Sequence, residues 1–442
     1  MWKLPEGAEF VLRRLHEAGY QGYVVGGCVR DTLLGKAPKD WDVCTNALPH
    51  EMQRVFADCH VIETGLQHGT LTVMYRHEPF EVTTFRVDGE YTDHRHPDEV
   101  IFVADVREDL SRRDFTVNAM AWSEETGVVD AFGGQEDLER RLIRCVGEPE
   151  KRFGEDALRI MRALRFASVY GFAIDPATDA AIHALKDTLK DVAAERIRVE
   201  LQKLLCGGAG EILRAYRDVI FTIFPALAAM DGFDQRTHHH LWDVWEHTVR
   251  AVEAVPPTET LRLAMLLHDC GKPGCFTVDE DGQGHAYGHE ERSVRLAEEM
   301  LAALKMDNAT RDRVLQLIAC HGWPVTPDRR LLKRRLNQLG EEALRQLIEV
   351  KRADALATGT KDPAAVELHR TETLAALEAL LAQKPCVTLK DMAVNGRDMM
   401  ALGAKGRVVG ETLQWLLEQL LDDALPNDRE ALLSAARAHL EA

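Results

Sequence analysis

Short β-branched runs separated by turns dominate the first 140 residues, which is the pattern of strands in a mixed fold. The segment 9–19 differs, because its apolar residues have the spacing of an amphipathic helix. From about Asp137 onward apolar residues recur at three and four positions, and Gly and Pro become sparse. We therefore expect an α/β head followed by a mostly α-helical remainder. The predicted strands lie in residues 22–27, 69–76, 80–87 and 99–106.

Two interruptions of the helical pattern predict boundaries, one at Gly207–Gly210 and one at Thr358–Pro363. With 442 residues, 45% of them hydrophobic, the chain is long enough to bury more than one core. It shows neither a signal-peptide pattern nor an apolar run of the roughly 18 residues that cross a bilayer. Its nine cysteines are scattered singly, as reduced core residues are. We expect a cytoplasmic protein without membrane contact.

The net charge of −18 argues against a surface covered with nucleic-acid-binding residues. Arginines nevertheless crowd one stretch, from Arg112 to Arg165, while the acidic excess is spread over the rest of the chain. Any contact with RNA is expected to begin in this stretch.

The clearest chemical signal is a double glycine followed by two carboxylates. A β-branched run leads into Gly26 and Gly27, a helix follows, and the next strand carries Asp40 and Asp42. Glycine lets the backbone approach a triphosphate, and a helix start offers free N–H groups to anions. Because side chains alternate along a strand, both carboxylates are expected on one face, where they suit a pair of Mg²⁺ ions. An ordinary acidic pair at an exposed strand end is the alternative.

Glu81 is a third candidate carboxylate. It opens a predicted strand in which it alternates with apolar Val82, so a neighbouring strand position would bring it to the pair. It is either an accessory site carboxylate or an ordinary strand-end charge.

Six motifs together resemble the CCA-adding enzyme family, class II members of the DNA polymerase β nucleotidyltransferase superfamily. The resemblance runs from about Tyr23 to Leu205 and resumes in the tail. It implies a DNA polymerase β-like head, a helical neck, body and tail, and template-independent addition of CCA to tRNA from CTP and ATP. The motifs are GGCVRD, DWDV, TGLQHGT, VTTFR, RRDFTVNAMA and EDALRIMRALRF.

The resemblance also implies roles for single residues. It assigns the catalytic Mg²⁺ ions to Asp40 and Asp42, and the triphosphate to Gly26, Gly27 and Arg30. Ribose and phosphate contacts are implied for Arg113, Asp114 and Asn118. The residues themselves agree, since two cations, a carboxylate and an amide at the start of an apolar helix suit such a ligand. A helix cap at Asp114 is the alternative.

Base selection without a template is predicted at Glu155-Asp156-Ala157-Leu158-Arg159, which reads as one helix. Three-residue spacing would put Asp156 and Arg159 on one face, where they offer the acceptor and donors that cytosine and adenine share. Uracil and guanine would leave a buried charge unpaired. Arg162 continues the ridge and is the expected triphosphate contact. The alternative is a Glu155–Arg159 pair within the helix, which leaves Asp156 unexplained.

The polar segment Arg86–Pro97 resembles a loop that switches full CCA-adding enzymes from CTP to ATP. Its presence favours CCA or A addition, and a plain connector is the alternative.

Downstream, four residues in helical segments resemble the ligand set of an HD-domain phosphohydrolase: His247, His268, Asp269 and Asp354. His289 and His321 lie between them and suit a second metal or a phosphate. Imidazole and carboxylate ligands together suit Mn²⁺, Ni²⁺, Co²⁺ or Mg²⁺. Hydrolysis of 2′,3′-cyclic phosphates or phosphomonoesters is the implied activity, and satisfied core histidines are the alternative. The tract 238–240 of three histidines has no assigned role.

The expected domains are a head (1–140), a neck with the base-selecting motif (141–206), a body linker (207–236), an HD domain (237–358) and a helical tRNA-binding tail (359–442). Three other functions stay open. The chain could add only the terminal A, could be a poly(A) polymerase, or could be an HD phosphohydrolase whose head no longer catalyses transfer. The acidic balance argues against a poly(A) polymerase, and the retained Asp40, Asp42 and Asp156 argue against an inactive head.

Overall fold

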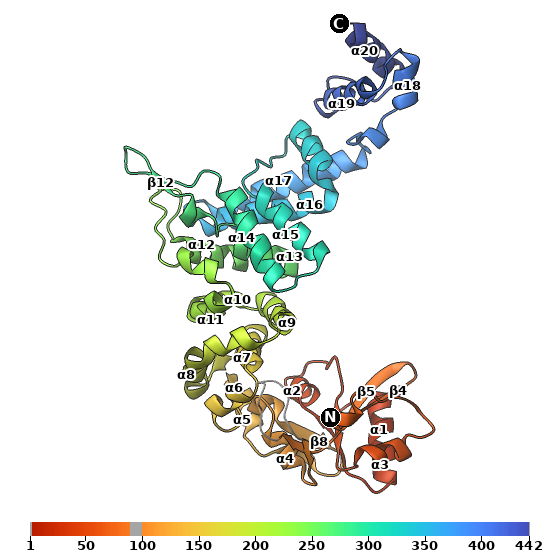
Figure 1. The fold of residues 1–442 in the computed structure, drawn as a ribbon, viewed down its shortest axis with the longest axis vertical. Helices are drawn as coiled ribbons and strands as arrows, with labels where there is room; N and C mark the ends of the chain where they lie inside the picture. Colours follow the sequence, from red (N-terminus) through yellow and green to blue (C-terminus); the bar gives the residue numbers. More distant parts are fainter. Residues whose placement is uncertain (1, 89–99, 442) are drawn as a thin grey trace. The chain divides into compact units, whose positions relative to one another are not determined.

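The computed structural model describes residues 2–88 and 100–441. The chain divides into two compact units, residues 1–225 and 226–442. The first unit carries a large sheet and the second is almost wholly helical (Figure 1). No helix in the described part of the chain combines the length and apolar character needed to cross a membrane.

The head is built on a seven-stranded sheet in the order β3-β4-β5-β2-β1-β8-β9. All neighbouring pairs are antiparallel except β2 and β5, which run parallel. The strands are β1 (Gly22–Val25), β2 (Val43–Thr45), β3 (His60–Ile62), β4 (Thr70–Tyr75), β5 (Glu78–Thr84), β8 (Met120–Ser123) and β9 (Gly127–Asp130). Three of the four predicted runs are therefore confirmed as strands of this sheet. The fourth contains β7 (Val100–Phe102), which pairs only with β6 (Arg86–Asp88).

β1 lies in the interior of the sheet, between β2 and β8, and all four of its residues are buried. Because both of its faces are covered, both carry apolar side chains. Tyr23 and Val25 point to the same face and pack with Leu110 of α4 (Val106–Ser111). The other helices of the head are α1 (Glu6–Glu17), α2 (Gly27–Leu33), α3 (Pro49–Val55) and α5 (Gly134–Arg140). The predicted opening helix is thus confirmed.

Helices follow the sheet, as the apolar spacing predicts. They are α6 (Pro149–Glu155), α7 (Leu158–Tyr170), α8 (Pro176–Leu185), α9 (Ala194–Leu205), α10 (Ala209–Ala215) and α11 (Arg217–Ile223). A short parallel pair, β10 (Leu142–Ile143) and β11 (Ala173–Ile174), lies among them. The predicted break at Gly207–Gly210 coincides with the turn between α9 and α10.

The second unit contains nine α-helices within its described residues: α12 (Val244–Ala254), α13 (Glu259–Leu267), α14 (His289–Ala303), α15 (Asn308–Cys320), α16 (Arg329–Ala357), α17 (Pro363–Ala382), α18 (Gly396–Ala401), α19 (Arg407–Leu421) and α20 (Arg429–Glu441). A small hairpin, β12 (Thr277–Val278) and β13 (Gly284–His285), precedes α14. The predicted boundary at Thr358–Pro363 is the turn between α16 and α17.

α16 is interrupted at Gly340, whose φ of 76° and ψ of 170° are not helical. Before this break, Lys333 and Arg334 bind Asp423 and Asp422 at 2.8 and 2.6 Å, just beyond α19. After the break, the helix carries the segment that ends at Ala357.

Candidate functional site

The head carboxylates lie at the start of β2 and beside β5. Asp40 and Asp42 precede the first residue of β2, Val43, rather than lying within the strand, which corrects the expectation of a strand-borne pair. The Asp42 carbonyl still accepts a hydrogen bond from Val25 N–H at 3.0 Å, which fixes its backbone beside β1. Val43 is paired with Val82 in the parallel register, so Glu81 lies next to Asp42. The prediction that Glu81 approaches the carboxylate pair from a neighbouring strand is confirmed.

Asp42 is accessible to solvent, but protein surrounds part of its carboxyl and several charged side chains lie close to it. Partial burial of its carboxyl by surrounding protein raises the pKa, and Glu81 and Asp40 raise it further, while Arg113 opposes the shift. Three carboxylates that repel one another favour a bound cation, because a divalent ion would offset the charge that the protein leaves uncompensated. The residues present therefore fit a Mg²⁺ site.

Arg113 is held next to this cluster by a buried aspartate. Its Nη2 donates to Asp109 Oδ2 at 3.3 Å, and Arg112 donates to Oδ1 of the same carboxylate at 2.9 Å. Burial alone would raise the pKa of Asp109, but the two arginines lower it, so the carboxylate stays charged. Asp109 was not among the candidates from the sequence. Its spacing of three and four residues from Arg112 and Arg113 was the available signal.

Gly26, the first residue of the double glycine, makes room for Arg113. Gly26 has a φ of 79°, and a Cβ atom there would lie 2.9 Å from Arg113 Nη1. A side chain at this position would therefore be strained by its backbone and would displace the guanidinium.

A chain of four polar side chains lies beneath the glycine turn. Arg30 donates to Asn118 Oδ1 at 2.5 Å, Asn118 donates to Asp114 Oδ1 at 3.1 Å, and Arg162 Nε donates to Asp114 Oδ2 at 2.7 Å. Burial would raise the pKa of Asp114, but Arg162, the bond from Asn118 and the charge of Arg159 lower it to about 2. The structure thus brings together four residues that come from three distant parts of the sequence and were predicted to bind nucleotide.

The base-selecting segment is not one helix, which corrects the sequence interpretation. Asp156 has an extended backbone, with φ −144° and ψ 103°, between the end of α6 and the start of α7. Its carboxylate accepts from Arg196 of α9 at 2.8 and 3.3 Å. Arg159 donates to Glu155 at 2.7 Å, the pair that the sequence offered as the alternative. Arg196 was missed because no local spacing links it to Asp156.

Part of the predicted switching loop Arg86–Pro97 lies outside the described residues, namely 89–97. Its first residues form β6.

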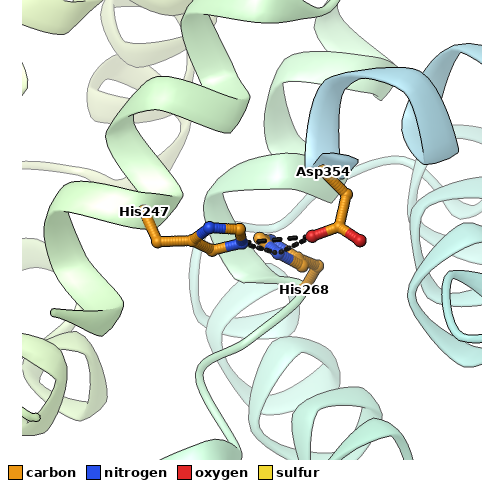
Figure 2. A group of neighbouring side chains, drawn as sticks. All are labelled: His247, His268 and Asp354. Atoms are coloured by element: carbon orange, nitrogen blue, oxygen red, sulfur yellow. Dashed lines mark hydrogen bonds and ion pairs between the residues drawn. The ribbon is translucent and has the colours of Figure 1, made fainter. Parts of the chain in front are cut away.

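A second cluster of titratable side chains lies in the helical unit. His247 of α12, His268 at the end of α13 and Asp354 of α16 converge, with His247 Nε2 3.1 Å from Asp354 Oδ1 and 3.3 Å from His268 Nε2 (Figure 2). These atoms lie within 4.8 Å of one another, as do one atom each of Asp269, His289 and His321. All four residues predicted for the HD site are brought together, and both extra histidines join them.

Backbone carbonyls orient three of these imidazoles. The Nδ1 atoms of His268, His289 and His321 lie 2.7, 2.8 and 2.6 Å from the carbonyls of Met265, Ala286 and Ile318. An Nδ1–H that donates to a carbonyl leaves Nε2 free to bind a metal, as in many metal sites. The sequence signal for this arrangement is a carbonyl three residues before each histidine, near a helix terminus.

Asp269 links the two groups. Its Oδ2 lies 3.1 Å from His268 Nε2 and its Oδ1 lies 3.3 Å from His289 Nε2, yet neither buried oxygen has a hydrogen bond of good geometry among the described residues. Lys272 Nζ is 2.7 Å from Oδ2. Burial opposes the charged forms, but mutual attraction lowers the pKa of Asp269 well below its ordinary value and raises the pKa of His268 to about 10. Buried carboxylate oxygens without hydrogen bonds fit divalent cations.

Four residues of this cluster line a cavity of about 470 Å³, namely Asp269, His289, His321 and Asp354. Lys272 and Lys361 also face it, as does His240 from the unassigned histidine tract. Burial, followed by the charge of Lys272, lowers the pKa of His240 to about 3, so its imidazole is neutral at pH 7. The cavity therefore offers metal ligands, cations and a neutral imidazole to one small anion.

Three family models match the chain. A model described as the poly A polymerase head domain matches residues 22–144, and one described as a probable RNA and SrmB-binding site of polymerase A matches residues 171–230. A third, described as putative tRNA nucleotidyltransferase domain 2, matches residues 291–436. The head fold, its carboxylates and these matches define a nucleotidyltransferase.

Relatives that match over nearly the whole chain show which family of nucleotidyltransferases this is. The chain is 35% identical to the CCA-adding enzyme of Levilactobacillus brevis over 98% of both chains, and 35% identical to that of Geobacillus kaustophilus over 97% of this chain and 95% of the relative. A crystal structure of the Bacillus stearothermophilus CCA-adding enzyme in complex with CTP matches with a TM-score of 0.77 at 30% identity, covering 100% of this chain and 98% of that one. The chain therefore belongs to the family of CCA-adding enzymes.

Proposed function

We propose that this protein builds and repairs the 3′-terminal CCA of tRNA in the cytoplasm, taking CTP and then ATP without a nucleic-acid template. The observation that carries the proposal is the convergence of Asp40, Asp42 and Glu81 at one sheet position, next to the turn that Gly26 opens for Arg113. The relative solved with CTP at 30% identity supports the nucleotide substrate. Relatives of full length that are CCA-adding enzymes favour this reaction over poly(A) synthesis.

Transfer is a displacement at the α-phosphorus of the nucleotide. The 3′-oxygen of the tRNA forms the new bond, its proton is lost, and the bond to pyrophosphate breaks. Asp40 and Asp42 would hold Mg²⁺, with Glu81 beside them, and bound Mg²⁺ activates the attacking hydroxyl and neutralises the phosphates. The chain itself positions the reactants.

The polar chain would hold the nucleotide. Gly26 and Gly27 let the backbone approach the triphosphate, and Arg30 and Arg162 offer it charge. Arg113, Asp114 and Asn118 would contact the ribose and phosphates. Because Asn118 already donates to Asp114 and accepts from Arg30, these side chains are oriented before a ligand binds.

Base choice would rest on Asp156 and Arg159. Asp156 is held by Arg196 and Arg159 by Glu155, so an incoming base exchanges or shares these contacts. Cytosine and adenine each offer an amine donor beside a ring nitrogen acceptor, which match a carboxylate and a guanidinium. Uracil and guanine offer the reverse order, so an acceptor would face the carboxylate and a donor would face the guanidinium. Both charged groups would then lack a hydrogen bond.

The domain assignment follows from these roles. The head (1–140) would catalyse transfer, the neck (141–206) would select the base, and residues 207–236 would link to an HD domain (237–358). The tail (359–442) would bind tRNA.

The test is incorporation of labelled nucleotides into tRNAs that end at the discriminator base, at C and at CC. Growth by CCA from the shortest substrate is the expected result. Addition of A only to the CC-ended tRNA would replace the proposal with an A-adding enzyme. A long adenosine product on any RNA would indicate a poly(A) polymerase, and no incorporation at all would contradict transferase activity.

A second candidate function is phosphoester hydrolysis at the histidine cluster, because Asp269 lies next to both groups of metal ligands and, within the described residues, neither of its buried oxygens has a hydrogen bond of good geometry. His247, His268, Asp269 and Asp354 would hold a divalent ion such as Mn²⁺, Ni²⁺, Co²⁺ or Mg²⁺. When bound, the ion supplies a water nucleophile near neutral pH. Water then gives its oxygen to phosphorus, and the alcohol leaves with a proton.

The test of hydrolysis is release of phosphate from nucleoside 3′-monophosphates, and ring opening of 2′,3′-cyclic phosphates, by protein loaded with each metal in turn. Asp269→Asn should abolish both reactions. Asp42→Ala should leave them unchanged, since Asp42 belongs to the other compact unit. Hydrolysis that survives Asp269→Asn would contradict this candidate.

A further inference from the structure

A second cleft lies beside the histidine cluster, between α16 and α17, with a volume of about 440 Å³. The apolar part of its wall is formed by Val325, Ile348, Ala355, Ala365 and Val366, and polar or charged residues line the rest. This volume falls in the ordinary range for small-molecule sites, roughly 300–1,000 Å³. Neither the transfer reaction nor the metal cluster uses it.

The cleft meets the metal-cluster cavity at two residues. Asp354 and Lys361 line both spaces, and Lys351 of the cleft donates from Nζ to the carbonyl of His321 at 2.8 Å. A ligand in the cleft would therefore have one end next to Asp354, one of the candidate metal ligands.

The charges in the cleft are arranged unequally. Arg352 pairs with Glu367 and Arg370 pairs with Glu349, so these two arginines are already neutralised. Among the described residues, Lys351 and Lys361 form no ion pair with a carboxylate within 4 Å, although the charges of Asp354 and Glu290 attract Lys351 while Lys361 repels it. A bound anion would pair with these two lysines, whereas the apolar wall further along suits a flat uncharged group. The end with the lysines is the end that reaches Asp354.

We propose that this cleft is the nucleoside subsite of the metal centre. The base of a ribonucleotide, or of a 3′-terminal RNA residue, lies against Ile348 and Val366, and its phosphate lies between Lys361 and the metal-binding side chains. This proposal rests on the hydrolytic function proposed above, and it names the substrate class as phosphates carried on a nucleoside rather than phosphoesters in general.

The test fills the cleft from its exposed side. Ala365 and Ala364 are both exposed at the start of α17, but only Ala365 lines the cleft. Ala365→Trp therefore blocks the subsite, and Ala364→Trp is the matched control. With Mn²⁺-loaded protein, Ala365→Trp should raise KM for adenosine 3′-monophosphate at least about five-fold with kcat retained. It should leave kcat/KM for glycerol phosphate within about two-fold of the control.

Equal effects on the two substrates, or no difference between the two tryptophan variants, would overturn the subsite. Failure of hydrolysis itself is distinguished by binding, measured by calorimetry with Mn²⁺-loaded protein. Adenosine 3′-monophosphate should bind more tightly than inorganic phosphate, and Ala365→Trp should remove that advantage. If wild-type protein binds the two equally, the cleft is not a nucleoside site, whatever the metal centre catalyses.

Discussion

Arg196 of α9 donates to both carboxylate oxygens of Asp156, which lies 40 residues earlier in the chain. Asp156 sits in the extended step between α6 and α7, where its Oδ1 also accepts a hydrogen bond from Leu158 N–H at 3.1 Å. The Arg196 fork and this backbone contact together set where the carboxylate points. A bidentate guanidinium defines both distance and plane, which a lysine would not do.

Arg196→Ala should weaken base choice. Without the fork, only Leu158 N–H holds the Asp156 carboxylate, so we expect kcat/KM for CTP to fall roughly 10-fold and the preference for CTP over UTP to shrink. Steady-state addition to tRNA lacking CCA measures both. Lys203→Ala, on the exposed surface of the same helix, is the control. An unchanged ratio of CTP to UTP would show that Arg196 only stabilises the neck.

Asp42→Ala should abolish nucleotide addition, with a loss of at least about 10³-fold in kcat, because the Mg²⁺ site loses its most crowded carboxylate. Glu81→Ala should cost less, about 10-fold, since Glu81 only borders the pair. Glu78→Ala, an exposed residue on the same strand, should have no effect. Full activity of Asp42→Ala would remove the head carboxylates from the mechanism.

Gly26→Ala and Gly35→Ala separate backbone strain from the loss of the Arg113 position. Both glycines have positive φ, 79° and 70°, so each substitution should cost about 1 kcal/mol of stability. A Cβ at Gly35 meets no heavy atom within 4 Å, whereas one at Gly26 meets Arg113. Only Gly26→Ala should raise KM for CTP. Thermal unfolding and kinetics measure the two effects, and equal KM values would contradict the role of the glycine turn.

Asp114 should make the neck sensitive to acid. Its pKa is about 2 in the folded protein against an ordinary value of 3.8, because Arg162 and Asn118 outweigh burial. A lowered folded pKa contributes stability that is present above pH 4 and is lost as the pH falls toward 2. The shift corresponds to a contribution on the order of 2 kcal/mol. The protection of α7 amides from hydrogen exchange should therefore fall as the pH is lowered. In Asp114→Asn these amides should be less protected at pH 7, and acidification should reduce their protection by a smaller amount.

Removal of divalent metal should lower the melting temperature of the helical unit. His268 and Asp354 would bind an ion only in the folded protein, so added Mn²⁺ stabilises the folded form by mass action. Calorimetric titration should give two ions at the cluster in wild-type protein and one in His321→Ala, since His321 belongs to only one ligand group. A melting temperature unaffected by chelator would argue for a purely structural cluster.

Much of this molecule could be predicted from short segments. The strands of the head follow from β-branched runs, and the glycine turn and carboxylates follow from two adjacent motifs. The four residues that resemble an HD ligand set were found although 107 positions separate His247 from Asp354. In each case the residue types of short segments were enough to indicate the chemistry, and folding then brings these segments together.

Local pattern failed where a distant contact decides the backbone or the charge. The step at Asp156 replaces a helix that the spacing favours, and its carboxylate accepts from Leu158 N–H at the start of α7 and from Arg196 of another helix. Asp109 is a single acidic residue outside any motif, so the sequence did not predict a role for it. In the structure it is buried and accepts a hydrogen bond from Arg113. The cleft beside Asp354 exists only because α17 packs on α16, so no motif marks it.

The break at Gly340 has a mechanical consequence. An unbroken α16 would behave as a rigid lever, and any swing of the tail gripped by Lys333 and Arg334 would be carried along it to Asp354. Gly340, outside the helical conformation, divides this lever in two. If the tail binds tRNA as proposed above, a bend at Gly340 would let it move while the spacing of the metal ligands stays constant.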